Sequence, residues 1–158
     1  AYLDLAVMTL GNSFTGRLMH EVRDQQGLTY GIGASVLKQS DQPSIVVNAS
    51  FKTDQLQKGI KATKDILRQF AEGKIGNDEL EVARTSIVNI TNTMGLDSKV
   101  VARNVLQRMS QGAQVDHSQR WNIINDPELN FDDVRQAVKQ ALHPDQFRYA
   151  AAGTGIGQ

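Results

Sequence analysis

Apolar residues recur along most of the chain three or four positions apart, between short segments rich in glycine, asparagine or proline. The clearest case begins at Phe14, where Leu18 and Val22 follow at intervals of four and Met19 joins the same side. This spacing predicts an amphipathic helix, ending near Gln25, whose apolar stripe is buried. Arg17, Glu21 and Asp24 should then face outward.

Helical spacing predicts seven helices in all. Several of them end at a glycine or a proline, notably Gly73, Gly95 and Pro144. The helix that Thr53 or Asp54 should cap is expected to lie across a sheet. The helices other than the one already described are predicted at 2–10, from 53 or 54 to 70, 77–94, 97–111, 116–125, and from 130 or 131 to 142.

The period changes after Gly27, and this change predicts strands. From Leu28 to Lys38 a period of two places Tyr30, Ile32, Ala34 and Val36 on one face. Residues 45–51 are β-branched and aromatic, and the turn at 40–43 should pair them antiparallel with the first strand. A third strand is predicted from Gln146 to Ala152, before a tail at 154–158. The order of elements indicates an α+β domain with an antiparallel sheet.

Composition narrows the function classes. The chain has 158 residues, a length that fits one domain over 1–158, and its 17 basic and 17 acidic residues give no net charge. No general attraction to nucleic acid or to an anionic membrane is therefore expected. The absence of cysteine excludes disulfides and thiolate metal sites and leaves the compartment open. No apolar run approaches the roughly 18 residues of a membrane-spanning helix, so a soluble chain is expected.

Arg23 and Tyr30 are the candidate binding residues. Arg23 falls in the last turn of the predicted helix, and Tyr30 follows seven positions later, across the glycine turn. A guanidinium and a phenol at the same end of a helix–strand unit would suit a peptide carbonyl or a developing oxyanion. In the alternative interpretation, Arg23 caps the carbonyls of its own helix and Tyr30 is half-buried in the sheet.

Five strings carry a resemblance to a known family. They are Phe14-Thr15-Gly16-Arg17-Leu18, Val22-Arg23-Asp24, Gly27-Leu28-Thr29-Tyr30-Gly31, Asn77-Asp78-Glu79-Leu80 and Phe131-Asp132-Asp133-Val134. In this order they closely resemble the non-catalytic half of the pitrilysin-like zinc peptidases, which include insulin-degrading enzyme and mitochondrial processing peptidase. The resemblance implies a metallohydrolase-like fold of the processing-peptidase type. Because full-length domains begin with another strand, it also implies that 1–158 is a fragment of the last domain of a peptidase half, lacking its first strand.

The resemblance also implies roles for the two candidate residues. Arg23 and Tyr30 match an arginine–tyrosine pair that the non-catalytic half contributes to a shared active site, where it binds the substrate backbone and stabilises the oxyanion. Zinc would lie on the catalytic half, fused or separate, and the two halves would close over an unfolded peptide. The alternative is a non-proteolytic scaffold or assembly subunit of the same fold. An unpaired sheet edge further predicts that the fragment self-associates.

No metal site and no independent peptidase activity are expected in this chain. The family's catalytic half holds zinc on a His-x-x-Glu-His motif. The histidines here, His20, His117 and His143, lie too far apart in the sequence for that spacing. The family's mitochondrial non-catalytic subunit has a long glycine-rich loop where this chain has Gly11-Asn12-Ser13. That difference favours a protein of the bacterial periplasm or cytoplasm. Gly16 also replaces the family's usual serine.

Overall fold

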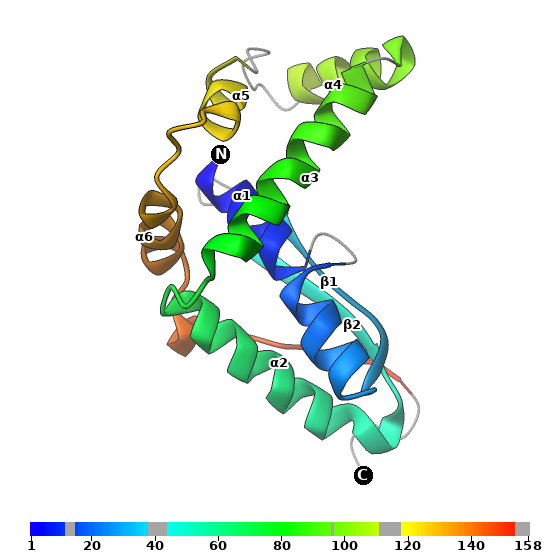
Figure 1. Ribbon diagram of the computed structural model, residues 1–158. Helices are drawn as coiled ribbons and strands as arrows, with labels where there is room; N and C mark the ends of the chain where they lie inside the picture. The colour runs from blue at the N-terminus through cyan, green and yellow to red at the C-terminus, as the bar shows by residue number, and fades with distance from the viewer. Residues whose placement is uncertain (12–14, 38–43, 96, 111–117, 154–158) are drawn as a thin grey trace.

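The computed structural model describes residues 1–11, 15–37, 44–95, 97–110 and 118–153 (Figure 1). Outside these ranges lie Ser13, the predicted helix start at Phe14, the predicted turn at 40–43, His117 and the tail at 154–158. The α+β class is confirmed. The described elements are α1 (Tyr2–Leu10), the π-helix η1 (Met19–Gln25), β1 (Thr29–Leu37), β2 (Ser44–Phe51), the 3-10 helix η2 (Thr53–Gln55), α2 (Leu56–Ala71), α3 (Asn77–Gly95), α4 (Ser98–Ser110), α5 (Ser118–Asn125), α6 (Phe131–Ala141) and the 3-10 helix η3 (Pro144–Gln146).

The helix α1 is the centre of the core. Every residue from Leu5 to Leu10 is buried, so this part of the helix turns no face to solvent. Strand β1, α3 and α6 all pack against α1. The one polar residue in the run, Thr9, donates its hydroxyl proton to the Leu5 carbonyl at 3.1 Å, which satisfies the buried group.

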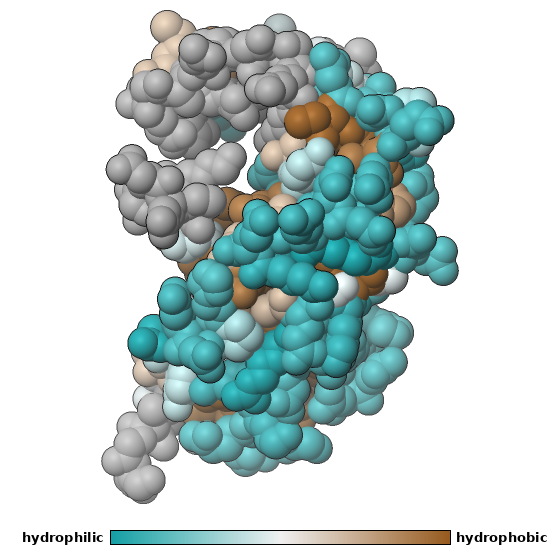
Figure 2. Space-filling model, turned by 90° about the vertical axis from the view of Figure 1, so that its left-hand side faces the viewer, coloured by the Kyte–Doolittle hydropathy of each residue, from teal (hydrophilic) through white to brown (hydrophobic). Residues whose placement is uncertain are grey.

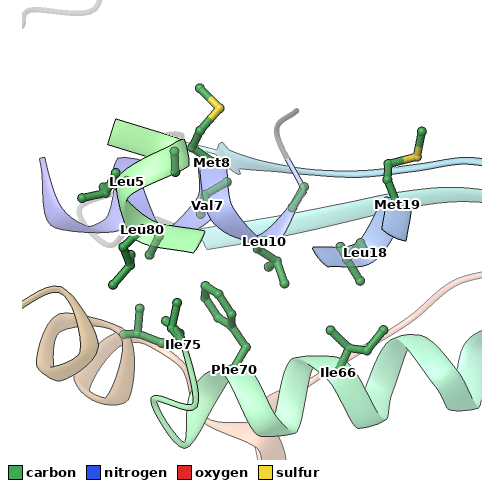
Figure 3. Packing of buried hydrophobic residues seen from close by; sticks show 14 of the residues in the cluster. Leu5, Val7, Met8, Leu10, Leu18, Met19, Ile66, Phe70, Ile75 and Leu80 are labelled. Carbon is green, nitrogen blue, oxygen red and sulfur yellow. The ribbon is translucent and has the colours of Figure 1, made fainter. Parts of the chain in front are cut away.

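The helix α2 covers the core from outside. Figure 3 shows Phe70 and Ile66 of α2 pointing toward Leu10 and Leu18, which belong to α1 and to the turn just before η1. The sequence places this helix across the sheet, and that expectation is wrong for most of its length because α1 and η1 lie between α2 and the strands. A helix as apolar as the part of α1 from Leu5 to Leu10 is the element that can occupy an inner layer.

The two strands form an antiparallel ladder that runs from Leu37↔Ser44 through Ile32↔Ala49 to Thr29↔Phe51. The predicted third strand at 146–152 is not found, because residues 147–153 pair with neither β1 nor β2. This segment lies beside α2 instead, where the Lys64 ammonium is 4.2 Å from the centre of the Tyr149 ring. A segment without a strand beside it cannot form a ladder.

The second predicted helix has its apolar stripe where the sequence places it. Leu18 and Val22 are fully buried and Met19 nearly so. Two features differ from the prediction. The helix has π geometry from Met19 to Gln25, and Arg17, expected to face outward, is 11% exposed in its side chain. Arg17 turns inward because Glu79 at the start of α3 offers it a carboxylate, with Nη2 and Oε2 2.6 Å apart.

The surface is mixed in character. Figure 2 shows that the face bearing α5 and α6 is mainly hydrophilic, with small apolar areas between polar side chains. Several exposed apolar residues lie on α3 and α4 instead: Val82, Ile90, Met94, Val101, Leu106 and Met109. Within the described ranges, no helix combines the length and the apolar character that crossing a membrane requires.

Candidate functional site

The candidate site lies where η1 ends and β1 begins. Gly27, at φ +61°, occupies the left-handed region that glycine adopts at little cost. Its N–H donates to the Arg23 carbonyl at 2.9 Å, and the Leu28 N–H donates to the Val22 carbonyl at 3.0 Å. These bonds close the helix and reverse the chain. The glycine stop predicted from the sequence is confirmed.

Tyr30 is the extra residue of a β-bulge. Thr29 pairs with Phe51 and Gly31 pairs with Ser50, so two steps along β1 match one step along β2. The bulge interrupts the alternation of faces. Ile32 and Ala34 are buried, whereas Tyr30 is 87% exposed. The prediction that Tyr30 shares the buried face of Ile32 is therefore wrong.

Thr29 takes the inward position next to Tyr30. Its side chain is buried, and its hydroxyl oxygen accepts a hydrogen bond from the Gly31 N–H at 3.1 Å. The same hydroxyl can donate its proton to the Gly31 carbonyl, at 2.9 Å, or to the Ser50 carbonyl of β2. The hydroxyl thus bonds to the backbone of both strands beside the bulge.

Arg23 and Tyr30 lie on one surface depression of about 360 Å³. Both side chains are exposed, and within the described part of the chain neither makes a hydrogen bond or an ion pair. Neither feature of the alternative interpretation is found among the described residues. The Arg23 side chain donates to no carbonyl of its helix, and Tyr30 is exposed rather than half-buried. The depression is lined by Arg23, Gly27, Leu28, Thr29, Tyr30, Ser50, Phe51 and Lys52.

The lining sets what this depression can do chemically. It holds two cationic side chains, Arg23 and Lys52, one phenol and no carboxylate or imidazole. Guanidinium and phenol groups donate hydrogen bonds to carbonyl oxygens and carboxylates. Without a general base beside it, the Ser50 hydroxyl is not an activated nucleophile. The depression is therefore suited to binding rather than to cleaving a peptide bond by itself.

The described residues do not fit a zinc site. Among them, no group of three or more His, Cys, Asp or Glu side chains could hold a metal ion. His20 is exposed and its ring nitrogen lies 3.1 Å from the Gln25 amide nitrogen. His143 is exposed just before η3, and His117 lies outside the described ranges.

The sequence interpretation did not include Thr29, Ser50, Phe51 or Lys52 in the site. A regular hairpin in the register of Ile32↔Ala49 would pair Tyr30 with Phe51, so the end of β2 could have been placed near Tyr30. The bulge itself has no such signal, because it depends on side-chain bonds to a strand some twenty residues away.

Comparisons with known proteins agree with this fold. The family described as the peptidase M16 inactive domain matches residues 1–87. A peptidase M16 inactive domain from Pseudomonas fluorescens has a TM-score of 0.73 at 24% identity, covering 91% of this chain and 34% of that one. The inactive peptidase domain of a candidate zinc protease from Bordetella parapertussis has a TM-score of 0.70 at 20% identity, covering 98% and 85%.

A candidate zinc protease from Bordetella pertussis is also similar, with a TM-score of 0.65 at 21% identity over 88% of this chain and 75% of that one. No curated protein matches the chain. The chain spans about a third of the Pseudomonas protein, at 34%. At these identities the structural likeness shows the shared fold, whereas the family match rests on the sequence of more than half of the 158 residues. The chain therefore belongs to the peptidase M16 inactive-domain family, the non-catalytic half of the pitrilysin-like peptidases.

Proposed function

We propose that this chain is a non-catalytic domain of a pitrilysin-like zinc metallopeptidase. It closes the peptide-binding chamber and supplies Arg23 and Tyr30 to a zinc site on another domain or subunit. One observation carries the proposal: the two side chains line the same depression, exposed and without partners in the described structure. Groups that a fold leaves solvated and unpaired side by side are available to a ligand.

The chemistry of the pair matches the task. The Arg23 guanidinium offers several fixed donors to a substrate carbonyl, and the Tyr30 hydroxyl offers a neutral donor to an oxygen on which negative charge develops. Closing a chamber over the depression would exclude water and strengthen both interactions. An unfolded peptide is the expected ligand, because an extended backbone presents its carbonyls to such donors.

Zinc belongs to the partner in this proposal. The described residues hold no metal cluster, and two of the similar structures come from candidate zinc proteases. The partner would be a zinc-bearing catalytic half, either fused to this chain or a separate subunit. This chain's own residues bind and orient the peptide.

Peptide binding by the full chain tests the proposed role of Arg23 and Tyr30. The probe is a fluorescein-labelled unstructured peptide, followed by anisotropy. Hydrogen bonds to charged groups contribute about 1.5–3 kcal/mol, so Arg23→Ala should weaken binding about ten-fold or more. Tyr30→Phe should weaken it less, because it removes one neutral donor.

Two controls remove the same groups elsewhere. Arg103→Ala deletes an exposed guanidinium on α4, and Tyr149→Phe deletes an exposed phenol hydroxyl near α2; both should bind the peptide like the wild type. In a second assay, cleavage should require the zinc-bearing half together with this chain, and the two site variants should slow it. Wild-type affinity and rate in both site variants would reject the proposal and leave the scaffold alternative.

A further inference from the structure

We propose that Thr29 is the positioning residue for Tyr30, and that its hydroxyl holds the bulge which turns the phenol into the depression. This inference rests on the proposed function in one respect, namely that Tyr30 binds peptide. Its structural basis is independent of that role. Tyr30 owes its exposure to the bulge, and the bulge is bonded by Thr29 on both strands.

The regular ladder defines where Tyr30 would otherwise point. Ile32↔Ala49 and Gly31↔Ser50 follow one register, which continued by one step would pair Tyr30 with Phe51. Alternate residues of a strand share a face, so Tyr30 would then lie on the buried side with Ile32. The bulge pairs Thr29 with Phe51 instead and exchanges the two faces. The small Thr29 side chain is buried and the large Tyr30 ring is exposed.

The Thr29 hydroxyl supplies hydrogen bonds that the interrupted ladder lacks. A bulge leaves backbone groups without their regular partners, and buried groups of this kind cost free energy. Here the Gly31 N–H donates to the Thr29 oxygen at 3.1 Å, and the hydroxyl proton has the Gly31 and Ser50 carbonyls within reach. A valine of the same shape would fill the space but bond to none of them. The bulge would then lose the bond from the hydroxyl to the Ser50 carbonyl of β2, and Tyr30 would lose its fixed direction.

The experiment uses the full chain with Thr29→Val, which removes the hydroxyl, and Thr29→Ser, which keeps it. The matched control is Thr63→Val, because the Thr63 hydroxyl also donates to a backbone carbonyl, that of Gly59 at 2.8 Å, but within α2. Two readouts are made on the folded protein. One is the affinity for the labelled peptide, and the other is the NMR shifts of Tyr30 together with the exchange rate of the Gly31 amide.

We expect Thr29→Val to weaken peptide binding several-fold, to speed exchange at Gly31 and to shift the Tyr30 resonances. Thr29→Ser should leave all three quantities close to their wild-type values, and Thr63→Val should change none of them. In a Tyr30→Ala background, Thr29→Val should cause no further loss of affinity, because a positioning residue acts through the side chain it positions.

The inference is overturned if Thr29→Val leaves the Tyr30 shifts and Gly31 exchange as in the wild type, or if it weakens binding equally in the Tyr30→Ala background. Failure of the proposed function has a different signature. In that case Tyr30→Ala binds peptide normally, and the NMR readout alone decides the role of Thr29.

Discussion

Glu79 joins three parts of the chain at one carboxylate. It accepts hydrogen bonds from Arg17 Nε at 2.9 Å and Nη2 at 2.6 Å, and from the Gly76 N–H at 2.8 Å. The Arg17 guanidinium in turn lies 5.8 Å from the centre of the Phe70 ring. Partial burial acts to raise the pKa of Glu79, but the hydrogen bonds from Arg17 and Gly76 and the Arg17 charge outweigh it, so the pKa lies below its usual value.

We predict that Glu79→Gln lowers the free energy of unfolding at neutral pH by about 1–2 kcal/mol, the lower part of the range for charged hydrogen bonds because Glu79 is partly solvated. A carboxyl whose folded pKa is depressed contributes stability above its unfolded pKa and loses it as pH falls through the folded pKa. The free energy of unfolding, measured with urea, should therefore fall more steeply on acidification in the wild type than in the variant.

The control for this prediction is Glu81→Gln, which removes a more exposed carboxylate that lies 3.1 Å from Arg84. Exposed pairs contribute little, so Glu81→Gln should follow the wild type at every pH. Equal acid dependence in the wild type and Glu79→Gln would show that the Arg17 pair does not stabilise the fold.

Residue-level prediction worked where the relevant contacts are local. The glycine turn brings Arg23 and Tyr30 to one end of a helix–strand unit, and their spacing in the sequence indicates this directly. The direction of Tyr30 and the burial of Arg17 could not be predicted in the same way. The first depends on the bulge, and the second on a carboxylate 62 residues away.

At the scale of elements, α1 and η1 approach each other through two glycines. A Cβ added to Gly16 would lie 2.7 Å from the Gly11 Cα and 3.0 Å from the Gly11 nitrogen. Real Cβ atoms do not come this close to backbone. Position 16, where the sequence comparison above expects a serine, has room here for glycine alone, unless α1 and η1 separate.

We predict that Gly16→Ala destabilises the chain by about 1–3 kcal/mol or more, as overpacking of a rigid site does. The control is Gly95→Ala at the end of α3, where an added Cβ meets nothing within 4 Å. Thermal unfolding of both variants measures the difference, and a Gly16→Ala protein as stable as Gly95→Ala would contradict the close approach.

The elements themselves were mostly predictable from periodicity. The helices α2 to α6 begin and end within a few residues of the ranges that apolar spacing indicates, and Asn130 caps α6 by accepting from the Asp132 N–H at 3.0 Å. Three features could not be predicted from periodicity: the missing third strand, the π geometry of η1 and the inner position of α1. Each of these depends on which neighbours pack against the segment, and a pattern along one segment does not contain that information.

At the scale of the whole molecule, the sheet has two unequal outer edges. On β1, the Ala34 N–H donates to the carbonyl of Gly11, the residue that follows α1, at 3.0 Å, so part of that side is occupied. Within the described residues, no strand pairs with the outer side of β2. A row of unpaired backbone groups is a template for another chain.

We predict that the chain self-associates through β2. Sedimentation velocity over a concentration series should show a dimer that grows with concentration, and Asn48→Lys should reduce it, because a lysine on an edge strand opposes pairing. Asn48 is exposed on β2, and the control Asn89→Lys adds the same charge to an exposed position on α3. A monomer at every concentration would contradict the prediction.

The buried helix α1 has a consequence for how this chain is made. Its apolar surface is covered by β1, α3 and α6, the last of which begins 129 positions after the start of α1. During synthesis, α1 leaves the ribosome well before α3 and α6, and contacts between such distant parts form slowly. Until α6 has been synthesised, part of the apolar surface of α1 therefore lacks its native cover and is open to chaperones, which bind exposed apolar segments.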